Sequence, residues 1–255
     1  SQPRAILEND NMHRGRFGAL MVSLVIAGCS AIPRDGTNSV GMERVCPGYD
    51  VSLPLSPVLV FGEMHGTTQA PAFFLGAVCA TLRMSDVPIV LVGLEFPLEQ
   101  AEPLARYLAS TGTDDDKTRL LATSFWNRAE QDGRTSSAMY GLVEALRVLG
   151  GSDSRLRVVV FDDRSGGDAA AQREARMAAT LEAALANHPD ARMLVLVGNL
   201  HAKRTPGFAG DPGFQSMALR MTVPVRSFAF RGNGGQIWAC MHDGCRIYSQ
   251  AENPA

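Results

Sequence analysis

The feature that most constrains this chain is a short apolar run followed directly by two ionisable side chains between glycines. Residues 58–61 are β-branched, aliphatic or aromatic, and they predict a fully buried strand. Glu63 and His65 follow, with Gly62 and Gly66 beside them, which indicates a tight turn before a helix. Ligands bind at such turns in open α/β sheets. A lone Gly-x-x-His can equally be a structural loop histidine, so the interpretation depends on the rest of the chain.

The same arrangement recurs along the chain. Three further apolar runs, near residues 88–94, 156–161 and 192–198, end at Glu95, Asp162 and a second Gly-x-x-His that contains His201. Amphipathic patterns of helical period separate these runs, which is typical of strands joined by helical crossovers. We therefore predict an α/β fold: a mostly parallel open sheet of about five strands, with helices on both faces. A fifth strand is expected over residues 223–230, and an antiparallel hairpin after it, closing the sheet edge.

Ionisable groups at matching strand ends predict a functional cleft. The carboxyl ends of parallel strands meet at one sheet edge, so His65, Glu95, Asp162 and His201 are expected to converge. Burying such groups costs several kcal/mol unless they are paired or bind something. We expect the side chains of His65, Glu95 and His201 to lie within about 10 Å of each other, given the spacing of neighbouring strands.

Two kinds of chemistry suit these residues. His65, His201 and Glu95 could hold a divalent metal with open positions. Alternatively, His65 could activate water without a metal, with Glu63 or Glu95 orienting its ring and His201 acting as the acid. The chain has no Gly-x-Ser-x-Gly elbow, no phosphate-binding loop and no dinucleotide fingerprint after the first strand.

Four further residues are candidates for substrate binding: Arg134, Asp162, Asn199 and Trp126. Arg134 follows an Asp-Gly turn, where a guanidinium could clamp an anionic group of the substrate. A structural ion pair on a surface turn explains the same arginine equally well.

The amino-terminal part reads as an export signal. Basic residues 12–16 precede an apolar run that is too short to span a bilayer and that ends in a lipobox-like sequence at Cys29. We expect a signal segment over residues 1–29, lipidation of Cys29, a tether over 30–50 and a single α/β domain over 51–250. An ordinary secretory signal cut near Ala31 is the alternative. The lipobox predicts an exported bacterial lipoprotein, anchored to the outer membrane through its lipid and facing the periplasm.

The other cysteines fit an oxidising compartment. Cys240 and Cys245 flank the turn of the expected hairpin, and we predict a disulfide between them. Cys79 lies on an apolar helix face and is expected to be a buried free thiol. Cys46 has no evident partner. The net charge is −2 and the basic residues are scattered, which excludes nucleic acid as an expected partner.

Together, the motifs resemble one known group. Residues 62–67 (Gly-Glu-Met-His-Gly-Thr), 93–95 (Gly-Leu-Glu) and 198–201 (Gly-Asn-Leu-His) resemble the superfamily joining erythromycin esterases, ChaN-type haem-uptake lipoproteins and TIKI-type proteases. The lipobox is most similar to the ChaN branch. The resemblance implies an α/β fold with both histidine motifs facing one cleft.

The branches of this group imply different functions. In the esterase branch, the histidine that matches His65 activates water without a metal, whereas the TIKI branch depends on a metal. The ChaN branch binds haem through a tyrosine, but the four tyrosines here lie outside the motifs. Two hypotheses follow. One is a hydrolase of a small ester or amide, esterase-like or metal-dependent. The other is an uptake lipoprotein that binds haem or iron without catalysis.

Overall fold

The computed structural model describes residues 42–46, 48, 51–165, 170–208, 210–230, 235–241 and 244–250. The predicted signal segment 1–29, its lipidated Cys29 and most of the tether lie outside these residues. Within the described ranges, every helix is too short or too polar to cross a bilayer.

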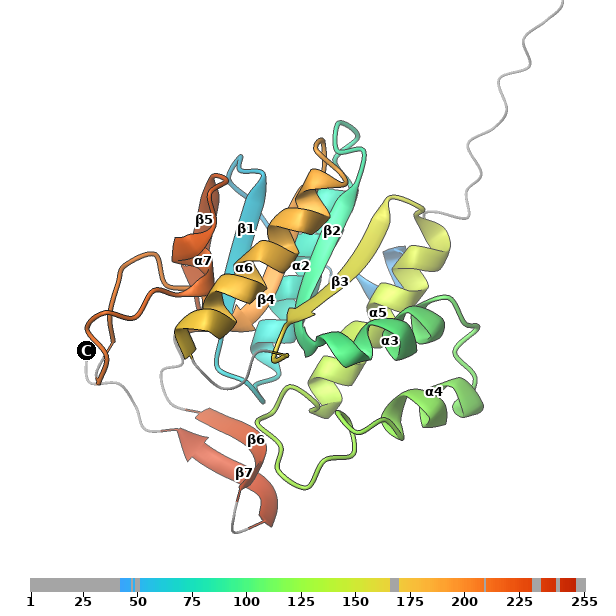
Figure 1. Ribbon diagram of the computed structural model, residues 1–255. Helices are drawn as coiled ribbons and strands as arrows, with labels where there is room; N and C mark the ends of the chain where they lie inside the picture. Colours follow the sequence, from blue (N-terminus) through green and yellow to red (C-terminus); the bar gives the residue numbers. More distant parts are fainter. Residues whose placement is uncertain are drawn as a thin grey trace, which may run out of the picture. The chain divides into compact units, whose positions relative to one another are not determined.

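A five-stranded parallel sheet forms the centre of the fold (Figure 1). Its order is β3-β2-β4-β1-β5, and every neighbouring pair is parallel. Strands β1, β2 and β4 are buried along their whole length, which explains their continuous apolar sequence. The strands are β1 (Val58–Glu63), β2 (Val90–Pro97), β3 (Leu156–Asp162), β4 (Arg192–Gly198) and β5 (Val225–Ala229). The predicted α/β class and parallel sheet are therefore confirmed.

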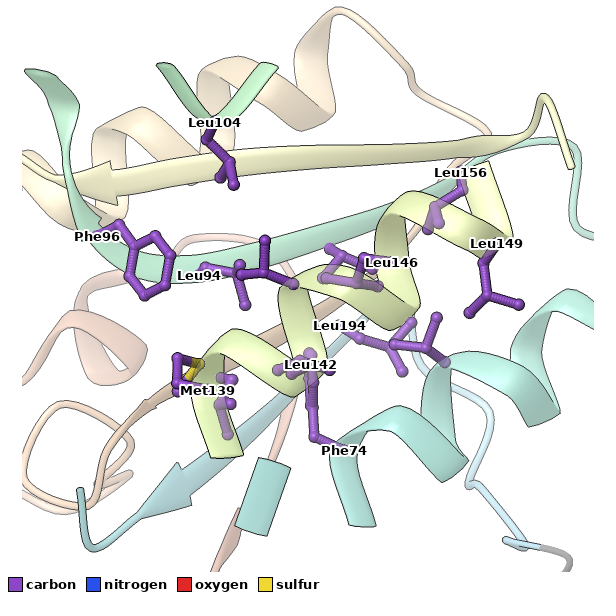
Figure 2. Packing of buried hydrophobic residues seen from close by; sticks show 14 of the residues in the cluster. Phe74, Leu94, Phe96, Leu104, Met139, Leu142, Leu146, Leu149, Leu156 and Leu194 are labelled. Carbon is purple, nitrogen blue, oxygen red and sulfur yellow. The ribbon is translucent and has the colours of Figure 1, made fainter. Parts of the chain in front are cut away.

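Helices cover both faces of the sheet. One face packs on a core to which α2, α3 and α5 contribute, and the other packs on α6 and α7. Figure 2 shows Met139, Leu142, Leu146 and Leu149 of α5 in the first of these cores. The helices are α2 (Gln69–Leu82), α3 (Ala101–Leu108) after the 3-10 turn η1 (Leu98–Gln100), α4 (Asp114–Leu121), α5 (Ser137–Ser152), α6 (Ala170–Ala186) and α7 (Met217–Arg220).

The carboxyl-terminal hairpin does not extend the main sheet. Strands β6 (Gly235–Met241) and β7 (Gly244–Gln250) form a two-stranded antiparallel sheet of their own. The hairpin bonds instead to the loops at the carboxyl end of the sheet: Trp238 N–H donates to Gly66 O, and Cys240 exchanges two backbone hydrogen bonds with Gln131. The expectation that it closes the sheet edge is wrong, because its backbone groups are taken up by these two loops.

Two disulfides cross-link the described residues. Cys240 bonds to Cys245, and their Cα atoms are 3.7 Å apart because they face each other directly across the hairpin. Cys46 bonds to Cys79 of α2, so the expectation of a free thiol at Cys79 is wrong. This second bond holds the helical turn at 42–45, where Met42 and Val45 pack on the core. This helical turn lies inside the stretch 30–50 that is predicted as a tether.

Candidate functional site

Strand order explains why the site residues meet. Strands β2, β4 and β1 are consecutive neighbours in the sheet, so the turns after them are adjacent. The turn after β4 bonds to the end of β1, since Asn199 N–H donates to Glu63 O at 2.9 Å. Gly198 allows a close approach there: a Cβ on it would lie 3.1 Å from Nε2 of His65. The residues predicted at separate strand ends therefore come together at one edge.

His65 lies between two carboxylates. Its Nδ1 is 3.0 Å from Oε1 of Glu63, and its Nε2 is 3.4 Å from Oε2 of Glu95. Burial disfavours the charged imidazole, but the negative charges of Glu95 and Glu63 outweigh it and raise the pKa of His65 to about 10. His65 therefore carries a proton on both nitrogens at neutral pH, and 21% of its side chain remains exposed.

Glu63 and Glu95 differ in the charges and hydrogen-bond donors that surround their carboxylates. Burial raises the pKa of Glu63 above its ordinary value of 4.5, and its Oε2 is buried with no hydrogen-bond partner among the described residues. Burial acts in the same direction on Glu95, but the charges of His65 and Arg134 hold its pKa well below 4.5. Its Oε2 also accepts from Gly198 N–H at 2.8 Å. Glu95 is therefore a fixed anion at the centre of the cluster.

Arg134 is a buried side chain that bonds to the ends of β2 and β3. Its guanidinium donates to Glu95 Oε1 at 3.2 Å, to Asp162 Oδ2 at 2.9 Å and to Asp132, and only 2% of the residue is exposed. Asp162 is fully buried and also accepts from Arg173 Nε at 2.7 Å. Both residues were predicted to bind substrate. The structure instead pairs them with each other, because two buried carboxylates at neighbouring strand ends require a buried cation.

Helix α6 supplies two residues that the sequence analysis missed. Glu174 Oε1 lies 2.7 Å from His201 Nδ1, and Arg173 donates to Glu95 Oε1 at 3.0 Å. Arg173 NH1 also lies 3.3 Å from His201 Nε2. Because a guanidinium can only donate, Nε2 accepts and the proton of a neutral His201 is on Nδ1, where it donates to Glu174. The sequence held a signal: Glu174 falls at helical spacing on the buried stripe that continues through Met177, Ala178, Leu181 and Leu185.

The side chains of the other two predicted substrate-binding residues contact groups outside this cluster. Trp126 packs edge-on against Phe96 and Tyr140 in the core, and its buried Nε1 has no hydrogen-bond partner within the described part of the chain. Asn199 donates from Nδ2 to Phe230 O at 3.2 Å, and a Cβ on Gly62 would lie 2.8 Å from its Oδ1. Trp126 therefore belongs to the core, and Asn199 joins the turn after β4 to the end of β5.

Two backbone segments, the 131–134 loop and the hairpin, pack against the turn that carries His65. A Cβ on Gly133 would lie 2.3 Å from Gly66 N, and a Cβ on Gly66 would lie 2.3 Å from Trp238 O. Both glycines have positive φ, 93° and 84°, which favours glycine in any case. Glycine at these positions lets the 131–134 loop and the hairpin pack directly against the His65 turn.

The donor set does not fit a metal ion. No group of three histidine, cysteine or acidic side chains is placed to hold one within the part of the chain that the structure describes. Arg134 and Arg173 both donate to Glu95 Oε1, and their charges would repel a cation there. Both carboxylate oxygens of Glu95 are therefore already bonded to protein donors. The predicted metal-binding set of His65, His201 and Glu95 is held together by salt bridges instead.

The space around the cluster is uneven. A crevice bordered by Glu63, Glu95 and Arg134 has no room for a water molecule. A much larger cavity of about 1020 Å³ begins one residue beyond His65, at Gly66, and one residue beyond Arg134, at Thr135. The volume that could hold a ligand therefore lies beside this crevice and not within it.

The fold and site define an α/β protein with a histidine-carboxylate cluster at the carboxyl edge of a parallel five-stranded sheet. A mutant of the erythromycin esterase EreC in its open conformation has this fold, with a TM-score of 0.58 at 12% identity, over 77% of this chain and 76% of that chain. A structure described as bacterial protein toxins gives a TM-score of 0.45 at 20% identity, over 68% of this chain and 34% of that chain. No family model and no curated protein matches the chain.

Proposed function

We propose that this protein is a hydrolase that cleaves a small ester or amide with water activated at His65. The supporting observation is the arrangement of His65, which has a carboxylate at each ring nitrogen and a partly exposed ring. Its fold is also that of a structure described as an erythromycin esterase. The Glu63 contact keeps a proton on Nδ1, so a neutral His65 has its lone pair on Nε2.

Each step then has a residue to carry it. Nε2 of neutral His65 takes a proton from water while the water oxygen bonds to the carbonyl carbon of the substrate. The imidazolium that forms is stabilised by Glu63 and Glu95, and it returns its proton to the leaving group as the bond to that group breaks. Arg173 donates to Glu95 and keeps 19% of its side chain exposed, so it supplies a positive charge at the edge of the cluster that solvent reaches. Arg134 and Glu174 act as positioning residues.

Turnover of a panel of p-nitrophenyl esters, lactones and anilides tests this proposal. His65→Ala should lower kcat/KM by about 10²–10⁴-fold on any substrate that is cleaved. His188→Ala is the matched control, because His188 follows α6 and lies outside the cluster. Equal losses in both variants, or none in His65→Ala, would reject the role of His65. A folded protein that cleaves none of the panel would count against hydrolysis of these classes.

Haem or iron capture is the alternative that the motif resemblance supplies. The large cavity has the volume for a sizeable ligand, but its described lining contains no histidine, tyrosine, cysteine or methionine to bind iron. The geometry therefore favours hydrolysis. Titration with haem should give no saturable shift of the Soret band. A shift that a tyrosine or histidine substitution abolishes would reverse this preference.

Export as a lipoprotein remains part of the proposal. The two disulfides support folding in an oxidising compartment. Expression of the chain in bacteria with labelled palmitate should give labelled protein in the outer-membrane fraction, and Cys29→Ser should remove the label. Label retained in Cys29→Ser would contradict anchoring at this cysteine.

A further inference from the structure

The large cavity has three walls that the predicted active site does not use. The turn after β1 forms one wall, at Gly66, Thr68 and Gln69. Residues 135–138 at the start of α5 form the second, and the hairpin forms the third. Its volume of about 1020 Å³ is at the upper end of the range for organic ligands.

The lining combines polar and apolar groups and carries no charged residue among those described. It presents hydroxyl or amide groups from all three walls, including Thr68, Ser137 and Gln236, and apolar surface from Ile237 and Trp238 of the hairpin. No described lining residue is acidic or basic. Thr135 adds a hydroxyl that is buried and has no hydrogen-bond partner among the described residues.

The hairpin wall is fixed to the turn that carries His65. Trp238 N–H donates to Gly66 O at 3.1 Å, and Cys240 N–H donates to Gln131 O at 2.7 Å. The wall that carries Trp238 is therefore bonded to the residue that follows His65. A ligand against this wall lies next to the turn that holds the proposed base.

We propose that the cavity binds an uncharged organic molecule that carries hydroxyl groups and an apolar part, and that this is the substrate class of the enzyme. The second half of this inference rests on the proposed hydrolysis at His65. Hydroxyl groups of such a ligand can pair with the side chains of all three walls, and its apolar part can cover Ile237 and Trp238. A carboxylate or ammonium group would lose its water without meeting an opposite charge.

Two probes that differ in one group test this selectivity: octyl β-D-glucoside, and octyl β-D-glucuronide with its carboxylate, both below their micellar concentrations. The chain has two tryptophans, so Trp126→Phe leaves Trp238 as the only fluorescent one. The glucoside should give a saturable change in Trp238 emission, and the glucuronide should bind at least about tenfold more weakly. Calorimetry on the unaltered chain gives the same comparison if Trp126→Phe does not fold. Equal affinities, or no saturable binding of the glucoside, would overturn the proposal.

A matched pair of variants tests whether the glucoside binds in the cavity. Gln236→Ala removes an exposed cavity amide and should weaken binding about fivefold, the effect of one hydrogen bond. Gln215→Ala removes an exposed amide outside the cavity and should leave affinity unchanged. Equal affinities in the two variants would contradict this site. His65→Ala should retain binding, so loss of turnover and loss of binding report separately on the proposed hydrolysis and on the cavity.

Discussion

Nδ1 of His201 lies 2.7 Å from Oε1 of Glu174, a contact that joins the turn after β4 to helix α6. The other oxygen of Glu174 accepts from Met217 N–H at 2.6 Å, where α7 begins. A single buried carboxylate therefore orients the imidazole and fixes a short helix. Because Nδ1 of His201 faces Glu174, the lone pair on Nε2 of a neutral His201 faces Arg173.

Replacing Glu174 with glutamine should destabilise the protein. Both carboxylate oxygens accept from donors, and an amide nitrogen would face one of those donors without bonding. We expect a loss of about 1–3 kcal/mol in the free energy of unfolding, measured in urea. Glu182→Gln is the control on the same helix, because half-buried Glu182 bonds to Thr222 through Oε1 alone, which a glutamine can still supply. A loss no larger than that of the control would show that Glu174 is not essential to this packing.

Replacing Arg134 with methionine should be more damaging. Glu95 and Asp162 would lose a buried cation, and the expected cost is about 3–5 kcal/mol. Arg106→Met breaks an ion pair on the surface of α3 and should cost at most about 1 kcal/mol. Chemical denaturation of both variants gives the comparison. Similar losses in the free energy of unfolding would mean that the buried ion pairs of Arg134 contribute no more to stability than a surface ion pair does.

Strand positions and strand-end residues could be predicted from the sequence because fully buried parallel strands leave continuous apolar runs. The predicted limits of β3 and β4 match the structure. The helix contribution was harder to predict. Arg173 and Glu174 lie among alanines and charged residues, and only the helical spacing of Glu174 relative to Met177 and Leu181 marks it as buried. The bond from Cys46 to Cys79 could not be predicted, because nothing local to either cysteine indicates the packing of residues 42–46 on the core.

Gly133→Ala should disrupt the loop over the His65 turn. The new methyl group would meet the backbone of Gly66, in addition to the strain of a positive φ. Gly210→Ala carries strain at a similar φ of 101° but meets no atom within 4 Å. We expect Gly210→Ala to cost about 1–2 kcal/mol and Gly133→Ala clearly more, with lower hydrolytic activity. Equal melting temperatures would mean that the loop moves aside without cost.

The two disulfides should contribute unequally to stability. Cys46 and Cys79 are 33 residues apart in sequence, whereas Cys240 and Cys245 are 5 apart. Loop-closure entropy predicts about 4 kcal/mol for the first and about 2 kcal/mol for the second. Paired serine substitutions at each bond, compared by urea unfolding, measure the difference. A larger loss for the hairpin pair would show that docking of the hairpin, and not loop length, determines the effect.

The dependence of kcat/KM on pH tests the proposed role of His65 most directly. Its pKa of about 10 means that the neutral form, which alone can accept a proton, increases about tenfold for each pH unit above 7. We therefore predict that kcat/KM for a cleaved ester, corrected for hydrolysis in buffer, rises with pH and levels off near pH 10. His65→Gln should lack this rise. A rate that is constant or falls between pH 7 and 10 would contradict water activation by neutral His65.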